Sequence, residues 1–219
     1  MRFDRRRGTA ASRANARFGR ARLRGVRIAI SGTHGSGKTT LLEDFIAAHG
    51  DYVHEPEPYE WLEAVYGEAT GAEPGVDDFR RQLELSVDRL RTYEPGARVV
   101  AERSPVDFLA YMLALMDLGR ASRDCEMIAC AAELVAAGTQ HVDLLVVLPL
   151  NVRDGLAVPE CEDVELRDAM NDRLVEIIAA DEYALFTNGS PRIVEIQGTR
   201  DQRLHALEIA ASDFDVKQP

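Results

Sequence analysis

The chain has 219 residues, of which 46% are hydrophobic, and its formal net charge at pH 7 is −11. This length suits one well-packed α/β domain and is too short for two domains of ordinary size. No apolar run approaches the roughly 18 residues of a membrane-spanning helix, and Cys125, Cys130 and Cys161 form no C-x-x-C pair. The sequence therefore argues against a membrane protein and against a sulfur-ligated metal site, and we expect a cytoplasmic protein with reduced thiols.

The amino-terminal segment differs from the rest of the chain in charge. The first 27 residues contain ten arginines and a single acid, so we predict a disordered arm over residues 1–25. This 27-residue segment carries a net charge of +9. Since the whole chain carries −11, residues 28–219 carry a net charge of −20. Such an arm can contact nucleic acid or an anionic membrane, or serve as a transit peptide. The acidic remainder instead favours a solvated tail or an upstream translation start, so we expect no membrane partner and regard nucleic acid as a weak alternative.

The first predicted strand, residues 26–30, leads into Gly32-Thr33-His34-Gly35-Ser36-Gly37-Lys38-Thr39-Thr40. This segment fits the phosphate-loop pattern G-x-x-x-x-G-K-[ST], and a helix should follow over residues 38–46. Its glycines allow backbone N–H groups to approach phosphate oxygens, and the helix directs its positive end at the same anion. Lys38 is expected to contact the β- and γ-phosphates, and the Thr39 hydroxyl to bind Mg²⁺. A simple strand-to-helix turn is the alternative, but the order of these features indicates nucleoside triphosphate binding.

Strands and helices alternate along the remainder of the chain. Apolar runs predict further strands at 51–54, 98–101, 142–148 and 192–196, and helices at 59–68, 76–93, 106–118, 123–137, 164–180 and 201–211. The alternation predicts an α/β fold with a five-stranded parallel sheet and helices on both faces, in a P-loop domain over residues 26–212. Ligands of such sheets bind at the carboxyl ends of the strands.

Two groups of charged residues follow predicted strands at that edge of the sheet. Glu102 and Arg103 follow the third strand, where a carboxylate can hold Mg²⁺ and an arginine can neutralise a transferred phosphoryl group. An ion pair at a helix start is the alternative. Glu55 and Glu57 follow the second strand, where a carboxylate can accept the proton of an attacking hydroxyl. Alternating prolines should hold these two acids extended and pointing in opposite directions, and we favour Glu55 as the base while Glu57 remains a candidate.

These motifs resemble a known group of enzymes. The phosphate loop, the Glu-Pro after the second strand with Trp61 nearby, and Glu102-Arg103-Ser104 resemble deoxynucleoside kinases and thymidylate kinases. The loop with Glu102-Arg103-Ser104-Pro105-Val106-Asp107 and a later Arg-Asp-Gly is also similar to the AAA-type P-loop domain of ribosylnicotinamide kinases. The resemblance extends over about residues 26–205, and the phosphate loop is its most specific part.

The resemblance implies roles for several residues in phosphoryl transfer. It makes the carboxylate after the second strand the general base, places Arg103 at the acceptor hydroxyl and the phosphoryl group, and puts Glu102 near Mg²⁺. Residues from about 150 to 173 correspond to the lid of these kinases. Arg153 and Arg167 in this segment are candidates for contact with the transferred phosphoryl group.

The resemblance also bears on the two ligands. Gly198-Thr199 is similar to the loop that holds adenine, with a helix start as the alternative, and no Asn-Lys-x-Asp guanine signature is present, which favours ATP. Gln82 corresponds to a residue that reads a base edge, or is an exposed helix glutamine. Trp61 and Tyr59 either stack on a ligand ring or pack in the core.

These features predict a Mg²⁺- and ATP-dependent kinase that transfers the γ-phosphoryl group to a hydroxyl of a nucleoside-like small molecule, with a homodimer as an allowed assembly. The alternative is an AAA-type ATPase or a nucleotide-dependent switch that acts on a macromolecular partner. A base candidate and lid arginines within one chain favour the kinase.

Overall fold

The computed structural model describes residues 25–68, 74–150, 163–186 and 190–214. One sheet contains five strands, which are β1 (Arg27–Ser31), β2 (Val53–Glu55), β3 (Val99–Glu102), β4 (Leu144–Val147) and β5 (Arg192–Glu195). Their order is β2-β3-β1-β4-β5 and every pairing is parallel. Each predicted strand overlaps an observed one, and the predicted α/β fold is confirmed.

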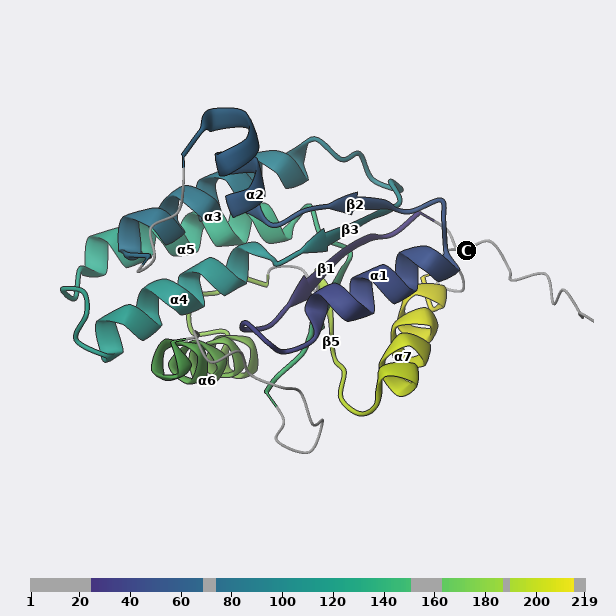
Figure 1. Ribbon diagram of the computed structural model, residues 1–219. Coiled ribbons are helices and arrows are strands. Elements are labelled where there is room, and N and C mark those ends of the chain that lie inside the picture. Colours follow the sequence, from purple (N-terminus) through teal and green to yellow (C-terminus); the bar gives the residue numbers. More distant parts are fainter. Residues whose placement is uncertain (1–24, 69–73, 151–162, 187–189, 215–219) are drawn as a thin grey trace, which may run out of the picture.

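The helices cover both faces of this sheet (Figure 1). They are α1 (Lys38–Ala48), α2 (Pro58–Trp61), the π-helical turn η1 (Leu62–Tyr66), α3 (Val76–Arg91), α4 (Pro105–Asp117), α5 (Cys125–Thr139), α6 (Val164–Ala180) and α7 (Arg200–Ser212). Helices α1 and α7 pack on one face, and α3, α4, α5 and α6 pack on the other. The two faces give the molecule two hydrophobic layers.

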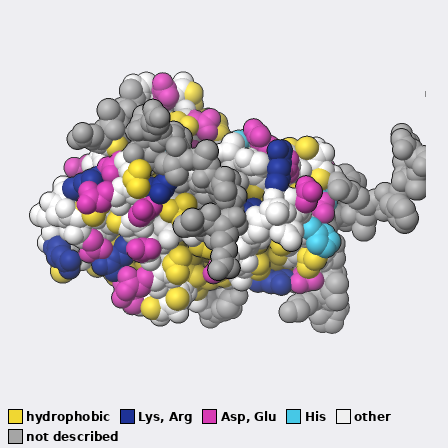
Figure 2. Space-filling view, turned by 60° about the horizontal axis from the view of Figure 1, so that its bottom comes forward, with side chains coloured by type: hydrophobic (Ala, Val, Ile, Leu, Met, Phe, Trp, Pro, Cys, Tyr) yellow, Lys and Arg dark blue, Asp and Glu magenta, His cyan; other side chains and the backbone are white. Residues whose placement is uncertain are grey.

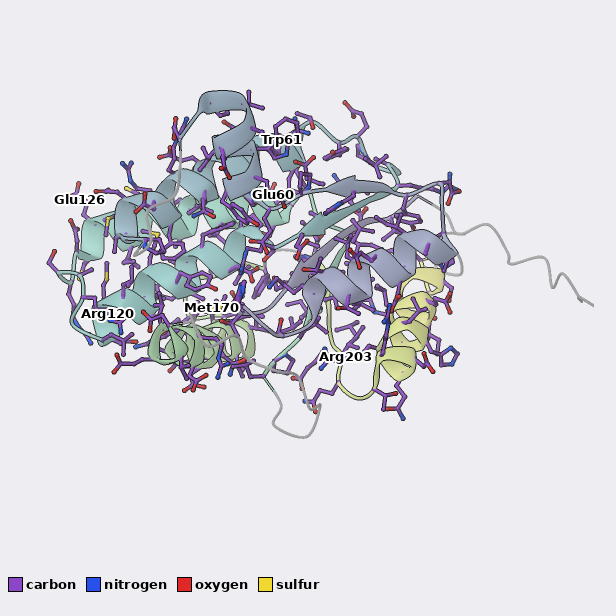
Figure 3. All side chains as sticks on the ribbon, viewed as in Figure 1. Glu60, Trp61, Arg120, Glu126, Met170 and Arg203 are labelled. Atoms are coloured by element: carbon purple, nitrogen blue, oxygen red, sulfur yellow. The ribbon has the colours of Figure 1, made fainter. Side chains whose placement is uncertain are left out.

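Alternation along the strands explains the two layers, because successive side chains of a strand point to opposite faces. Ile28 and Ile30 of β1 join the layer under α1 and α7, whereas Ala29 between them joins the layer under α3 to α6. Helix α4 is buried from Pro105 to Met116, which accounts for its nearly continuous apolar sequence. Met170 of α6, labelled in Figure 3, is fully buried against this second layer.

The segment after β2 differs from the single helix predicted at 59–68. Pro58 begins α2, and the backbone N–H of Glu57 donates to the Glu60 carboxylate at 3.3 Å. The helix then continues as the π-helical turn η1, which has a wider turn than an α-helix. It ends at Gly67, whose φ is 68°. Glu57, with φ −59° and ψ 141°, is therefore extended, as predicted, and directly precedes helix α2.

The strand register brings the candidate residues to one edge of the sheet. Ile30 pairs with Glu102, and Glu55 pairs with Ala101, so β1, β2 and β3 end at about the same level. Gly25 apart, the predicted arm over residues 1–25 lies outside the described residues, as do residues 151–162 of the predicted lid. The arm, the lid and the domain boundaries stay predictions.

The described surface carries charges of both signs. In Figure 2, arginine and acidic side chains lie among one another at the left of the view, the end to which α4, α5 and α6 extend. Ion pairs of the described surface include Arg120 with Asp163 and Arg173 with Glu176. Of the helices in the described ranges, none is both long and apolar enough to cross a bilayer.

Candidate active site

The phosphate loop connects β1 to α1 and packs tightly against its surroundings. A Cβ on Gly32 would lie 2.5 Å from Ser36 Oγ and 2.7 Å from the carbonyl oxygen of Leu148, so no larger residue fits there. Gly37 precedes α1 with a φ of 89°, in the left-handed region that favours glycine. Within the predicted loop, His34, Thr39 and Thr40 are exposed, Gly35 and Gly37 are half-buried, and Gly32, Thr33, Ser36 and Lys38 are buried. The amino end of α1 is thus presented as an anion site.

Lys38 is a buried cation within this loop. Its side-chain Nζ donates to the carbonyl oxygen of Thr33 at 3.0 Å. Burial and then the charge of Arg103 lower the pKa of Lys38 to about 8, against the opposing effect of Glu57 and other nearby acids. A phosphate beside Nζ would reverse that shift, so the site favours a polyanionic ligand.

Thr39 and Glu102 form a candidate magnesium site. The Thr39 hydroxyl donates to Glu102 Oε1 at 2.6 Å, and His54 Nε2 lies 3.8 Å from Glu102 Oε2. Burial raises the pKa of Glu102. Hydroxyl and carboxylate oxygens suit Mg²⁺, which usually takes one or two protein ligands and fills its other positions with phosphate and water. Across the described ranges no three His, Cys, Asp or Glu side chains cluster as a metal site.

Glu57 and Arg103 form a buried ion pair beside the loop. Arg103 Nε donates to Glu57 Oε2 at 2.6 Å, and Arg103 Nη1 donates to the carbonyl oxygen of Gly32 at 3.2 Å. Arg103 has a φ of 72°, an uncommon conformation for a residue with a side chain, and such strain is often retained at functional sites. Burial opposes ionisation of Glu57, but Arg103 and Lys38 outweigh it and lower its pKa. A carboxylate and two cations therefore meet at the loop.

Glu55 lies in a different cluster, between β2 and the carboxyl-terminal part of α3. Arg89 Nε and Trp61 Nε1 donate to Oε1, and Arg89 Nη2 donates to Oε2, each at 2.8 Å, while the Tyr93 hydroxyl also donates to Oε2. Burial opposes ionisation of Glu55, but Arg89 and Tyr93 outweigh it and lower the pKa of Glu55. Burial and the bond to Glu55 raise the pKa of Tyr93 to about 12, which keeps its hydroxyl a donor. Both oxygens of Glu55 are thus fully engaged.

The aromatic residues near this cluster have distinct environments. Trp61, labelled in Figure 3, stacks on Arg89, whose guanidinium carbon lies 4.1 Å from the ring centroid. Tyr59 is exposed. Trp61, which was predicted to stack on a ligand ring or to pack in the core, therefore stacks on the Arg89 side chain in this structure.

A small pocket adjoins both ion pairs. It is lined by Glu55, Pro56, Pro58, Trp61, Ser86, Arg89, Leu90, Ala101, Glu102 and Arg103. One turn of α3 before Ser86, Gln82 is 5% exposed, so the alternative of an exposed helix glutamine is wrong. No hydrogen bond joins the Gln82 side chain to another residue of the described ranges.

Sequence reasoning missed Asp107. Its buried carboxylate accepts hydrogen bonds from the hydroxyls of Ser31 and Ser104 and from the backbone N–H groups of Gly32 and Ser104. Asp107 thereby ties the start of the phosphate loop to the β3–α4 connection that carries Glu102 and Arg103. The signal for this role was present, because Ser104 followed by an acid three residues later is a capping-box pattern.

Arg203 and the tethering function of Arg89 were also missed. Arg203 of α7 donates to the carbonyl oxygens of Ser36 and Gly198, although nothing in its helix distinguishes it from a surface arginine. Gly198 has a φ of 105° and precedes Thr199, the cap of α7, as the alternative of a helix start expects. A role for Gly198 at adenine stays a prediction.

The lid arginines are placed in part. Arg153 lies outside the described residues. Arg167 of α6 donates to Asp168 Oδ1 from Nε at 2.9 Å and from Nη2 at 2.8 Å, and its backbone carbonyl accepts from Thr33 Oγ1 at 3.1 Å. Arg173 pairs with Asp117 and Glu176 at the surface. The start of α6 therefore contacts the phosphate loop, and phosphoryl contact by Arg153 and Arg167 stays a prediction.

Comparison with known proteins places this fold in a wider group. A family model described as an AAA domain matches residues 27–203. No curated protein matches the chain. The structure is similar to deoxyadenosine kinase from M. mycoides with bound dATP, at 16% identity and a TM-score of 0.59, over 84% of this chain and 98% of that chain. It is similar to thymidylate kinase from Candida albicans at 16% identity and a TM-score of 0.59, over 88% of this chain and 93% of that chain.

A third likeness is to the NadR protein in complex with NAD and AMP-PNP. The identity is 19% and the TM-score 0.53, over 88% of this chain and 50% of that chain. The chain therefore spans about half the length of NadR. At such identities these likenesses show a shared fold, and the predicted resemblance to this group of P-loop proteins is confirmed.

Proposed function

Since the chain belongs to the AAA-domain family and shares its fold with P-loop nucleoside kinases, we propose that it is a kinase that uses ATP and Mg²⁺. The acceptor is a hydroxyl of a nucleoside-like small molecule. The single observation that carries the proposal is the buried Glu57–Arg103 pair, which adjoins both the phosphate loop and the small pocket. A proton acceptor, a fixed positive charge and an anion site are the parts that phosphoryl transfer needs.

The residues around the loop suit each part of the reaction. The backbone N–H groups at the start of α1 and Lys38 hold the phosphates. Thr39 and Glu102 would hold Mg²⁺, which when bound neutralises charge on the β- and γ-phosphates. The acceptor oxygen attacks the γ-phosphorus as the bond to the β-phosphate oxygen breaks, and the acceptor proton passes to a carboxylate.

We assign that carboxylate to Glu57, whereas the sequence favoured Glu55. Glu55 accepts four hydrogen bonds, so it can receive a proton only by losing a donor. Arg103 is the side-chain donor to Glu57 within the described residues, and the same arginine faces the phosphate loop. When Arg103 turns part of its charge to the phosphoryl group, the pKa of Glu57 rises and Glu57 becomes a better base.

A nucleoside-like acceptor is supported by the walls of the pocket. Trp61 and Arg89 provide a flat wall. Gln82 is not among the lining residues, but it is buried one turn of α3 before the lining residue Ser86, and its amide can pair with a ring edge. ATP remains the proposed donor, with Gly198 near adenine and with Arg153 and Arg167 at the transferred phosphoryl group.

The experiment is phosphoryl transfer from γ-labelled ATP with Mg²⁺ to pooled nucleosides and ribosyl compounds, with a water-only control. The wild-type protein should yield a labelled acceptor, and Lys38→Ala should yield none. Label that is released only as inorganic phosphate would reject the kinase.

That second outcome would instead favour a nucleotide-dependent ATPase or switch that acts on a macromolecule. The match to a family described as an AAA domain is the observation on its side. It predicts slow hydrolysis without a small acceptor, and a partner whose affinity changes with the bound nucleotide.

A further inference from the structure

Arg203 connects two backbone segments that are far apart in the sequence. It lies on α7, is 5% exposed, and is labelled beside that helix in Figure 3. Its Nη1 donates to the carbonyl oxygen of Ser36 at 2.7 Å, and its Nε donates to the carbonyl oxygen of Gly198 at 3.0 Å. One guanidinium therefore joins the phosphate loop to the turn that begins α7.

The contact with Ser36 fixes the direction of the next amide. A trans peptide is planar, so the carbonyl of Ser36 and the N–H of Gly37 point in opposite directions. While Arg203 holds the carbonyl on the α7 side, the Gly37 N–H is aimed away from α7, at the amino end of α1. Within the described ranges this N–H has no hydrogen-bond acceptor, as expected of a group kept for a ligand.

The other end of the loop is held in the same way. Arg103 Nη1 donates to the carbonyl of Gly32, which aims the Thr33 N–H in the opposite direction. Two arginines therefore orient two peptide planes of the loop. Arg103, which follows β3, orients the Gly32–Thr33 peptide, and Arg203 of α7 orients the Ser36–Gly37 peptide. A guanidinium suits this task because its fork of N–H groups can hold two acceptors at fixed angles.

We propose that Arg203 is a positioning residue for the triphosphate. It orients the Ser36–Gly37 peptide so that the Gly37 N–H binds a phosphate oxygen, and it couples the docking of α7 to triphosphate affinity. The inference rests on the proposed nucleotide binding by the phosphate loop, but it does not depend on the identity of the acceptor.

The test measures binding of Mg²⁺-ATP by calorimetry without any acceptor. Arg203→Met should raise the Kd by roughly tenfold or more, the loss expected for one hydrogen bond to a charged group. Arg203→Lys keeps the charge but loses the fork, and its Kd should lie between those of the wild type and the methionine variant. The matched control is Arg192→Ala, because Arg192 also tethers α7, through Asp213 at the far end of that helix. Its Kd should stay within about twofold of the wild type.

A second readout separates positioning from a loss of structure. In the wild type, the amide proton resonance of Gly37 should move downfield when ATP binds, because the N–H gains a phosphate acceptor. Arg203→Met should weaken or remove that movement while the spectrum remains that of a folded protein. An unchanged Kd with the Gly37 shift retained would overturn the proposal.

If Arg203→Met does not fold, Arg203→Lys decides the question, and a wild-type Kd in that variant overturns the proposal. Lys38→Ala serves as the reference for a protein that does not bind the triphosphate in the calorimetric measurement. A protein that binds ATP through Arg203 yet phosphorylates no acceptor would reject the proposed kinase and leave this inference standing.

Discussion

Two glutamates separated by one proline make ion pairs of different kinds. Glu55 pairs with Arg89 and also accepts from Trp61 and Tyr93, so its carboxylate is enclosed by donors that belong to the fold. Glu57 pairs with Arg103, which also reaches the phosphate loop. The first pair is complete in itself, whereas the second can exchange partners with an anionic ligand.

The comparison teaches that distance from the strand end does not decide which acid performs chemistry. In a continuous strand, residues two apart point to the same face, but β2 ends at Glu55 and Glu57 already precedes α2, so the two acids have different surroundings. The donors that surround each carboxylate are the basis for assigning a structural role to Glu55 and the proposed role of base to Glu57.

Among the arginines, the largest effect is expected at Arg103. Arg103→Lys keeps a positive charge but cannot hold Glu57 and the Gly32 carbonyl together, so kcat should fall by about 10²- to 10³-fold. The corresponding change in the other pair, Arg89→Lys, should lower kcat by less than about tenfold, because Arg89 contacts neither the loop nor the proposed phosphoryl group. Steady-state kinetics of both variants checks the contrast, and equal losses would contradict it.

The Glu55–Arg89 pair should act mainly through stability. Glu55→Gln leaves charged and polar donors with a weaker acceptor and should lower the free energy of unfolding by about 1–3 kcal/mol. Because the folded pKa of Glu55 lies below its ordinary value of 4.5, its stabilisation is present above that pH and is lost as the pH falls below it. Denaturant unfolding at neutral and acidic pH should show the gap between wild type and variant closing in acid. A gap that does not change with pH would count against the ion pair as its cause.

A smaller effect concerns the pH dependence of nucleotide affinity. Lys38, with a pKa of about 8 in the free protein, is charged below that pH and loses its proton above it. The Kd of Mg²⁺-ATP should therefore rise from pH 8 upward, by at most about tenfold per pH unit, since one proton is linked to binding. Lys38→Arg should bind less tightly with no such slope. A flat wild-type profile up to pH 10 would show that burial does not perturb Lys38.

The smallest effect is expected at Arg173, an ion pair remote from both glutamates. Its partners Asp117 and Glu176 are partly exposed, so Arg173→Ala should change the free energy of unfolding by less than about 1 kcal/mol and leave kcat unchanged. Thermal unfolding and steady-state assays provide the check. A large loss of kcat would mean that this arginine belongs to the lid chemistry.

Local signals in the sequence were sufficient for the sheet, the phosphate loop and the gathering of acids at one edge. The loop is a short segment whose glycines, lysine and hydroxyl carry their own chemistry, and the strands are continuous apolar runs. The assignment between Glu55 and Glu57 needed long-range contacts. Arg89, Tyr93 and Arg203 lie 34, 38 and 167 residues from the groups they contact, and no local pattern encodes such pairs.

The most direct test of the account compares Glu57→Gln with Glu55→Gln in one assay of phosphoryl transfer and one of unfolding. Glu57→Gln should lose about 10²- to 10⁴-fold in kcat, the usual worth of a general base, and should also lower the free energy of unfolding, because it leaves the buried Arg103 charge without its carboxylate. Glu55→Gln should lose stability and retain most of its kcat. The opposite pattern, with Glu55→Gln inactive but stable and Glu57→Gln active, would contradict the assignment of Glu57 as the base.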